Sequence, residues 1–290
     1  MDETSLPVPA PGGRILTAAA FGPTDGFPVI SLHGTPGSRH HRPPDAAVLE
    51  RTGTRLITYD RPGYGASSRL AGRRVADAAV DVATVADAFA LGHFAVTGYS
   101  GGGPHALAVA ALLGHRVTRC ATVACLAPMD AYGLDFFAGM SAGNLEEFDQ
   151  ALAGEATLSA ALDPVAGAVA EDVYAFMAAL RADLPEADAH AMDRPDVGQW
   201  LAVSVAEGLR PGAGGWVDDD LAFTAPWGFD VGTIAVPVGV WHGTVDTLVP
   251  VSHAGWLAQA IPGAQGRLVT GAGHLGMLDE LGEVYRWLAG

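Results

Sequence analysis

The chain has 290 residues, 16 of them basic and 32 acidic, so its formal net charge is −16 with histidine neutral. Every basic residue is arginine, and the absence of lysine excludes Schiff-base chemistry and any phosphate loop that depends on a lysine. A chain this acidic is not expected to bind nucleic acid, because neutralising phosphates requires clustered basic side chains.

Short runs rich in Val, Ile, Leu and Thr alternate with Ala-rich helical stretches up to about residue 127, and the alternation resumes near residue 236. This pattern is typical of parallel strands joined by crossover helices. It predicts an α/β fold with a mostly parallel, twisted sheet flanked by helices. The expected strands are 14–20, 28–32, 55–59, 94–99, 119–126, 236–241 and 266–270, and the expected helices are 75–91, 101–113, 252–260 and a last one ending at 288.

The stretch from residue 128 to 232 differs from its surroundings. It has apolar residues at helical spacing, such as Phe136, Met140 and Phe176, but no convincing strand, so we expect a helical insertion. Between residues 130 and 230 there are 19 acidic side chains against three arginines, whereas the rest of the chain is neutral. The net charge of the protein therefore lies in the insertion.

The sequence predicts a soluble cytoplasmic protein with reduced thiols. Residues 1–4 carry acids where an export signal needs positive charge, and no apolar run reaches the roughly 18 residues that suggest a membrane span. Cys120 and Cys125 lie five positions apart in one expected strand, which puts them on opposite faces. We therefore expect two buried thiols and no disulfide between them.

The strongest chemical signal is Gly98-Tyr99-Ser100-Gly101-Gly102, a G-x-S-x-G sequence between an apolar strand and a helix. A sharp turn that lifts a serine hydroxyl above the sheet edge needs strained backbone angles and close strand–helix packing, and the flanking glycines permit both. The start of the following helix favours developing negative charge. Ser100 is therefore a candidate nucleophile.

A second glycine-containing loop, His33-Gly34-Thr35-Pro36-Gly37, follows the expected strand 28–32 and leaves the sheet where it can face Ser100. The backbone N–H groups of Thr35 and Gly101 are candidates for an oxyanion hole, which would hold the oxygen that becomes negative when Ser100 attacks a carbonyl. His33 is expected to support the loop rather than to act as a base.

An acid and a histidine follow two later strands, at positions that suit a Ser, Asp, His order. His274 would act as the base that takes the proton of Ser100, and Asp246 would fix the imidazole tautomer and stabilise the imidazolium. Asp130, after the strand expected at 119–126, is the alternative acid. We favour Asp246, because only it lies in a His-Gly-x-x-Asp turn.

Together these motifs, in this order, resemble the α/β-hydrolase family over about residues 14–127 and 236–288. The resemblance implies a hydrolase core of residues 1–127 and 233–290. It makes residues 128–232 a helical cap, or lid, that roofs the active site and sets substrate choice. Ser100 argues against the dehalogenases and epoxide hydrolases of the family, which use an aspartate nucleophile.

The expected function is a cofactor-independent serine hydrolase that cleaves a small carboxylic ester or thioester through an acyl-enzyme on Ser100. The resemblance leaves alternatives open. One is amide hydrolysis as in prolyl aminopeptidases, although no Trp follows the serine here. Another is carbon–carbon bond hydrolysis or hydroxynitrile elimination by the same triad. A third is a non-catalytic ligand-binding receptor.

The substrate is expected to be a small molecule beside Leu248, Leu275 and Trp227, which are candidates for an apolar pocket wall. An acidic cap favours neutral or cationic substrates, although a solvated acidic surface explains the same charge. No histidine or carboxylate spacing predicts a metal site. The sequence leaves a homo-oligomer open and predicts no membrane partner.

Overall fold

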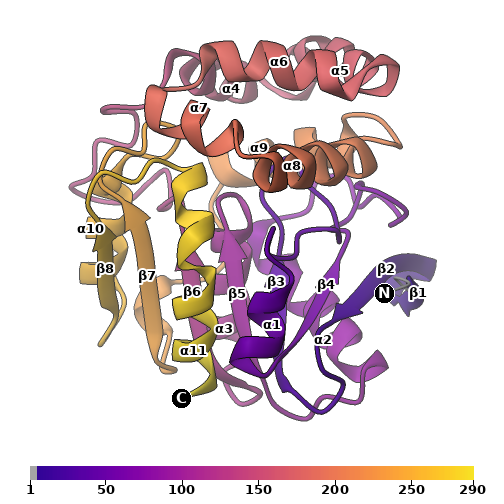
Figure 1. Ribbon diagram of the computed structural model, residues 1–290, viewed down its shortest axis with the longest axis vertical. Coiled ribbons are helices and arrows are strands. Elements are labelled where there is room, and N and C mark those ends of the chain that lie inside the picture. Colours follow the sequence, from indigo (N-terminus) through magenta and orange to yellow (C-terminus); the bar gives the residue numbers. More distant parts are fainter. Residues whose placement is uncertain (1–4) are drawn as a thin grey trace.

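An eight-stranded sheet forms the centre of the protein in the computed structural model, which describes residues 5–290 (Figure 1). The strand order is β1-β2-β4-β3-β5-β6-β7-β8, with β3 to β8 parallel and β2 antiparallel to both β1 and β4. Residues 1–4, on which the argument against an export signal rested, lie outside the described residues. The strands are Leu6–Ala10 (β1), Arg14–Phe21 (β2), Phe27–Leu32 (β3), Thr54–Tyr59 (β4), Phe94–Tyr99 (β5), Val117–Val123 (β6), Val238–Gly243 (β7) and Gln265–Val269 (β8).

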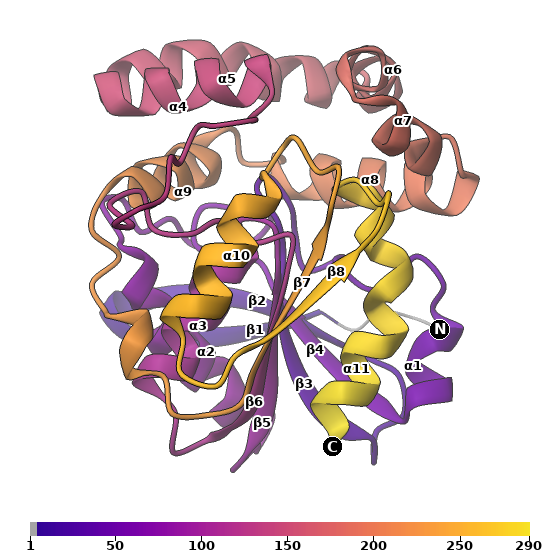
Figure 2. The same cartoon turned by 90° about the vertical axis from the view of Figure 1, so that its left-hand side faces the viewer.

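Helices cover both faces of the sheet and also its upper edge. Helices α2, α3 and α10 lie on one face, α1 and α11 lie on the other, and α4 to α9 lie above the carboxyl ends of the strands (Figure 2). The helices are Ala47–Thr52 (α1), Ala78–Ala88 (α2), Gly102–Leu112 (α3), Ala142–Ala153 (α4), Glu155–Glu171 (α5), Val173–Asp183 (α6), Glu186–Met192 (α7), Pro195–Gly208 (α8), Gly214–Thr224 (α9), Val251–Ala260 (α10) and Leu281–Ala289 (α11), with short 3₁₀ helices at Pro11–Gly13 (η1), Val75–Asp77 (η2), Val231–Thr233 (η3) and Leu275–Glu280 (η4).

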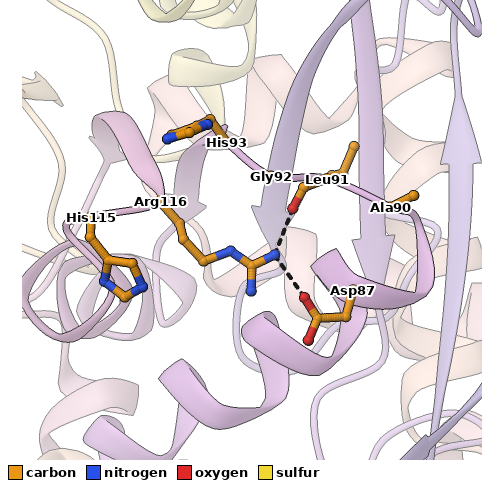
Figure 3. Close-up of a pocket in the computed structure, with 7 residues that line it drawn as sticks. All are labelled: Asp87, Ala90, Leu91, Gly92, His93, His115 and Arg116. Atoms are coloured by element: carbon orange, nitrogen blue, oxygen red, sulfur yellow. Dashed lines mark hydrogen bonds and ion pairs between the residues drawn. The ribbon is translucent and has the colours of Figure 1, made fainter.

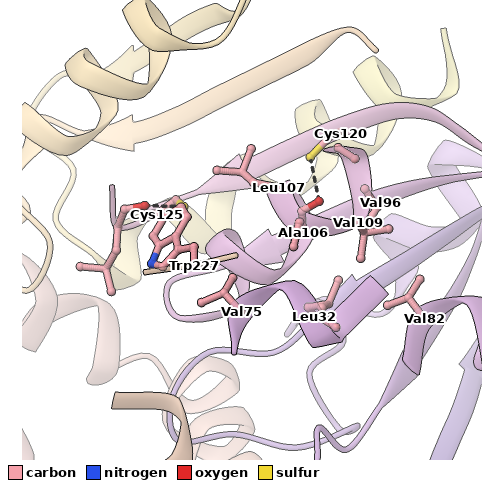
Figure 4. Packing of buried hydrophobic residues seen from close by; sticks show 14 of the residues in the cluster. Leu32, Val75, Val82, Val96, Ala106, Leu107, Val109, Cys120, Cys125 and Trp227 are labelled. Carbon is pink, nitrogen blue, oxygen red and sulfur yellow. Dashed lines mark hydrogen bonds between the residues drawn. The ribbon is translucent and has the colours of Figure 1, made fainter. Parts of the chain in front are cut away.

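Apolar patterning explains how these elements pack. All six residues of β5 are buried, as expected for a central parallel strand covered on both faces. In α11 the buried residues Leu281, Val284, Tyr285 and Leu288 recur at helical spacing, and they pack against the sheet. Figure 4 shows the core on the opposite face, which includes residues of α3.

The segment between β6 and β7 folds into α4 to α9, and its described residues form no strand. These helices have an apolar cluster of their own, which includes Leu158, Leu162 and Val205. Two residues from outside the segment, Tyr64 after β4 and Leu275 after β8, also belong to this cluster. The segment therefore packs on itself and reaches the loop that follows β8.

Strand β1 was missing from the sequence prediction. It contains Pro7 and Pro9, which have no backbone N–H to donate. An inner strand needs N–H groups for pairing on both of its sides, so prolines are tolerated mainly in edge strands. The structure places β1 at the edge of the sheet, where it pairs only with β2.

The expectation that Cys120 and Cys125 lie on opposite faces of one strand was wrong. Strand β6 ends at Val123, and Ala124 turns the chain with φ 52°. As a result both thiols are buried in the same apolar cluster, and neither forms a disulfide. Burial raises the pKa of both thiols, which keeps them protonated.

Among residues 5–290, no helix combines the length and apolar character that crossing a membrane requires.

Candidate active site

Ser100 lies at the tip of a tight turn between β5 and α3. Its φ of 52° is the left-handed conformation that non-glycine residues rarely adopt. The turn also requires glycine on both sides: a Cβ on Gly98 would lie 2.1 Å from the carbonyl oxygen of Gly102, and a Cβ on Gly102 would lie 2.1 Å from the carbonyl oxygen of Leu32. The Ser100 N–H donates to the carbonyl of Val123 at 2.8 Å, which fixes the turn to the neighbouring strand. The strained backbone and the close strand–helix packing that the G-x-S-x-G sequence predicted are therefore both present.

Asp246 and His274 are in direct contact, although 28 positions separate them. The turn after β7 carries Asp246, and the loop after β8 carries His274. The imidazole Nδ1 lies 2.7 Å from Oδ2 of Asp246, and both side chains are buried. The other carboxylate oxygen, Oδ1, accepts the backbone N–H groups of Leu248 and Val249, each at 2.9 Å. Asp246 is therefore held in place from its own turn and aimed at the imidazole.

The charges of this pair shift both pKa values. Burial alone would lower the pKa of His274, but the neighbouring Asp246 carboxylate outweighs burial and raises it. Burial would likewise raise the pKa of Asp246, but His274 and His242 outweigh burial and lower it. Asp246 is consequently ionised at neutral pH, and it stabilises a positive charge on His274.

Sequence reasoning assigned no role to His242, which lies four residues before Asp246 at the end of β7. Its Nε2 is 2.7 Å from the carbonyl oxygen of Val249 and 3.4 Å from Oδ2 of Asp246. The side chain is fully buried. The feature of the sequence that could have indicated His242 is its position four residues before Asp246.

Tyr99 connects the His274 loop to the turn that carries Ser100. The Tyr99 hydroxyl donates to the carbonyl of His274 at 2.8 Å, and the two rings meet edge to face with centroids 5.3 Å apart. Within residues 5–290, no hydrogen bond joins the Ser100 hydroxyl to the His274 imidazole. The structure thus brings Asp246 and His274 into contact and fixes the His274 loop to the residue that precedes Ser100. Bonds to a catalytic nucleophile often tighten only when substrate is bound.

The loop after β3 packs against the Ser100 turn. A Cβ on Gly34 would lie 3.5 Å from Cβ of Ser100, and one on Gly101 would lie 2.2 Å from Oγ1 of Thr35. Thr35 and Gly101, the residues predicted for an oxyanion hole, are therefore immediate neighbours. In the described part of the chain, neither backbone N–H donates a hydrogen bond to a protein acceptor.

A buried ionic network lies behind this loop, and sequence reasoning did not find it. Asp219, in α9, is fully buried and pairs with the guanidinium groups of Arg61 and Arg73. Its Oδ2 also accepts the hydroxyl hydrogens of Thr35 and Tyr64, each at 2.7 Å. Burial would raise the pKa of Asp219, but the two arginines hold it well below its usual range. The available signal was the run of three aspartates at 218–220.

The same network holds His33, which the sequence indicated as structural, and also His105. His33 accepts the backbone N–H of Arg61 at Nε2, at 3.0 Å, and its Nδ1 contacts the carbonyl of Gly34 at 2.8 Å. His105 Nδ1 lies 2.8 Å from the carbonyl of Gly101. Burial and the nearby arginines lower the pKa of both, that of His105 to about 3. Both imidazoles are therefore neutral and serve as hydrogen-bonding supports.

Other acidic residues between β6 and β7 also pair with arginines of the sheet core. Because these pairs neutralise part of the segment's charge, its acidic excess is not only a solvated surface. The pairs in this group are Arg39–Glu207 at 2.6 Å, Arg69–Asp218 at 2.9 Å and Arg69–Glu155 at 3.2 Å. In one further pair the arginine belongs to the segment and the acid to the core: Arg194–Asp279 at 2.6 Å.

Glu147 and Asp220 form a carboxyl pair between α4 and α9. Burial raises the pKa of both side chains, and the charge of Glu147 raises that of Asp220 further. The Trp216 indole N–H also donates to Glu147 at 2.8 Å.

The three residues predicted to contact substrate lie in different environments. Leu248 follows Asp246 in its turn and is half-buried, and Leu275 packs into the apolar cluster of the α4–α9 segment. Trp227 lies in the core cluster, stacked on Phe229 with ring centroids 5.9 Å apart (Figure 4). Asp130, the alternative acid, is exposed in the loop after β6.

Two surface depressions lie away from Ser100. The first, of about 450 Å³, is lined by residues such as Asp87, His93 and Arg116, and Figure 3 shows Arg116 paired with Asp87. It lies before the start of β5, at the end of that strand opposite Ser100. The second, of about 480 Å³, lies between the α5–α6 junction and the end of α8. Among residues 5–290, no cluster of His, Cys, Asp and Glu has the arrangement needed to hold a metal ion.

Comparisons with known proteins agree with this architecture. Residues 28–281 match the family described as alpha/beta hydrolase fold. A non-heme chloroperoxidase from Streptomyces lividans is 28% identical over 245 residues, which cover 81% of this chain and 79% of that protein. A bromoperoxidase structure from Bacillus anthracis superposes with a TM-score of 0.72 at 20% identity, covering 99% of each chain. An esterase structure from Rhodococcus sp. gives a TM-score of 0.68 at 23% identity, covering 100% of this chain and 99% of that one.

Proposed function

Because the chain belongs to the alpha/beta hydrolase fold family, we propose that it is a serine hydrolase that cleaves a small carboxylic ester or thioester. The observation that carries the proposal is the hydrogen bond between His274 and Asp246, in a loop fixed to the residue before Ser100. The esterase from Rhodococcus sp. shares this fold.

In the proposed reaction, Oγ of Ser100 attacks the carbonyl carbon while Nε2 of His274 takes the hydroxyl proton. Asp246, which occupies Nδ1, keeps Nε2 available as the base and stabilises the imidazolium. The N–H groups of Thr35 and Gly101 hold the oxyanion. His274 then protonates the leaving alcohol or thiol, and the acyl group stays on Ser100. Water attacks this acyl-enzyme with His274 again as base, which releases the acid.

In this proposal residues 128–232 act as the cap over the reaction centre, and they set the substrate class. The acidic excess of this segment favours neutral or cationic substrates, to the extent that its carboxylates are not already neutralised by core arginines. A matched series of neutral, cationic and anionic nitrophenyl esters tests this. We expect kcat/KM to favour the cationic ester at low salt, and equal rates at all salt concentrations would contradict it.

The central experiment compares the wild type with Ser100→Ala and, as a matched control, Ser159→Ala in α5. Each is treated with a fluorophosphonate probe and assayed on nitrophenyl esters of increasing acyl length. We expect labelling and turnover in the wild type and in Ser159→Ala, and neither in Ser100→Ala. Unchanged hydrolysis by Ser100→Ala would refute the proposal, and an unlabelled wild-type protein would favour a ligand-binding role.

A second candidate, haloperoxidase activity, is favoured by the name of the Streptomyces lividans relative. An assay of monochlorodimedone halogenation with hydrogen peroxide and bromide tests it directly. Aminoacyl arylamides in the ester panel test the amide-hydrolysing alternative. Halogenation or amide cleavage without ester hydrolysis would replace the ester proposal.

A further inference from the structure

Asp188 in α7 contacts the loop that carries His274, and it takes no part in the proposed reaction. Its side chain is fully buried, and its Oδ1 accepts the N–H of Leu275 at 2.7 Å. The carboxylate also fills the space beside Gly273, where a Cβ would lie 2.5 Å from Oδ1. Asp188 therefore contacts both residues that flank His274, Gly273 and Leu275.

Apolar and ionic contacts reinforce this junction. The side chain of Leu275 packs in the same buried cluster as Ala191 and Met192 of α7. Next along the chain, Arg194 forms an ion pair with Asp279 of η4 at 2.6 Å. The loop after β8 is thus held by α7 and the start of α8 as well as by the sheet.

The Asp188 carboxylate is also an electrostatic neighbour of the imidazole. His274 faces two carboxyl groups, Asp246 from the turn after β7 and Asp188 from α7, and the neutral hydroxyl of Tyr99 from β5. Burial lowers the pKa of His274, and both carboxylates raise it. The pKa of Asp188 is raised, because burial outweighs the opposing charge of His274. Within the described residues Oδ2 of Asp188 has no hydrogen-bond partner.

We propose that Asp188 is a positioning residue that couples docking of the α4–α9 segment to the reaction, by fixing the His274 loop and stabilising the imidazolium. This inference rests on the proposed function. An interaction that strengthens when His274 becomes positively charged lowers the barrier of the chemical step rather than substrate binding. The loop contact acts on the same step, because a small misplacement of the base slows proton transfer.

The experiment compares Asp188→Asn, which keeps an oxygen acceptor but loses the charge, with Asp188→Ala, which loses both. Glu186→Gln is the matched control, because it removes an exposed carboxylate from the same helix. The titration of His274 is followed by NMR in histidine-labelled protein, with its signal assigned by the His274→Gln variant. The pH profile of kcat/KM is measured on the same proteins.

In Asp188→Asn we expect the His274 midpoint and the acid limb of kcat/KM to move down by about one pH unit. In Asp188→Ala we expect kcat to fall by about 10²-fold with KM little changed. Glu186→Gln should match the wild type in the His274 midpoint, the acid limb of kcat/KM and kcat. A His274 midpoint that is the same in the wild type, Asp188→Asn and Glu186→Gln would overturn the inference.

The imidazole titration separates this inference from the proposed function. If the wild-type protein neither hydrolyses esters nor reacts with the phosphonate, the proposed function fails, while the NMR midpoints still show whether Asp188 acts on His274. If Asp188→Ala does not fold, Asp188→Asn still decides the electrostatic part, and Gly273→Ala decides the positional part. A Cβ at that position displaces the carboxylate, so Gly273→Ala should also lower kcat, and wild-type kcat there would contradict the positional role.

Discussion

The hydroxyl of Thr35 donates a hydrogen bond of 2.7 Å to the carboxylate of Asp219, although 184 positions separate the two residues. This bond ties the loop after β3 to helix α9. Since Asp219 also pairs with Arg61, whose guanidinium donates to the carbonyl groups of His33 and Gly34, one buried carboxylate organises the whole loop.

Replacing Asp219 should destabilise the fold strongly. Asp219→Asn leaves two buried guanidinium groups without their counter-charge, which costs about 3–5 kcal/mol of unfolding free energy. Urea denaturation measures this loss. Asp193→Asn, which breaks an exposed pair with Arg181, is the control and should leave the unfolding free energy nearly unchanged. Equal losses in the two variants would contradict the assigned role of the network.

The pH dependence of Asp219 has a definite sign. Burial opposes its ionisation, but Arg61 and Arg73 hold its folded pKa well below the ordinary aspartate value. A lowered folded pKa contributes stability that is present above the unfolded pKa and is lost as the pH falls through the folded pKa. We therefore expect the stability difference between wild type and Asp219→Asn to persist at neutral pH and to shrink only in strongly acidic solution, as urea titrations at several pH values will show.

Ser100 should cost the protein stability because of its backbone conformation. A φ of 52° is unfavourable for any residue with a Cβ, and glycine adopts it without that cost. Ser100→Gly should raise the unfolding free energy by about 1 kcal/mol over Ser100→Ala, while both variants lose turnover. Comparing the three proteins by chemical denaturation checks this, and a less stable glycine variant would show that the turn is not strained.

Activity should rise with pH through the titration of His274. Only neutral His274 accepts a proton, and Asp246 outweighs burial to raise its pKa above the ordinary value of 6.5. The acid limb of kcat/KM should therefore have a midpoint above 6.5. Asp246→Asn should move it down and reduce kcat by about 10⁴-fold. Asp130→Asn, the exposed alternative acid, should leave both unchanged, and the reverse result would reassign the acid.

The stability contribution of His274 has the opposite sign to that of Asp219. A raised folded pKa stabilises the fold fully below the unfolded histidine pKa, and this contribution is lost as the pH rises through the folded value. In the proposed reaction, His274 is therefore most active as the base in the pH range where its ion pair with Asp246 stabilises the fold least.

Gly101 should be intolerant of a side chain. A Cβ there meets Oγ1 of Thr35 at 2.2 Å, and that oxygen cannot move without breaking its bond to Asp219. Gly101→Ala should lower kcat by roughly 10²-fold with a two-state fold retained. Gly143→Ala in α4, where a Cβ meets only open space, is the control and should keep full activity. Steady-state kinetics on a nitrophenyl ester distinguishes the two.

Local pattern was enough to predict most of the sheet and the positions of the turns that carry the candidate site residues. The run before Gly98 is apolar on both faces, and its glycines permit a turn that other residues cannot make, so β5, Ser100 and α3 were predictable within a residue or two. Pattern failed at β1, whose prolines are tolerated only because the strand lies at an edge, and at the end of β6, where Ala124 turns.

The sequence by itself determined most of the order of strands and helices in the sheet core and the identity of Ser100, Asp246 and His274 as candidates, because glycine turns and apolar periodicity act over a few residues. Only the tertiary structure decided which charges meet. Asp188 and Asp219 are two of the 19 acidic residues between positions 130 and 230, and even the run of three aspartates at 218–220 does not indicate which partners Asp219 meets. Their roles depend on burial against particular partners, Leu275 for one and Arg61 with Arg73 for the other, and burial of a charge is a property of the assembled chain.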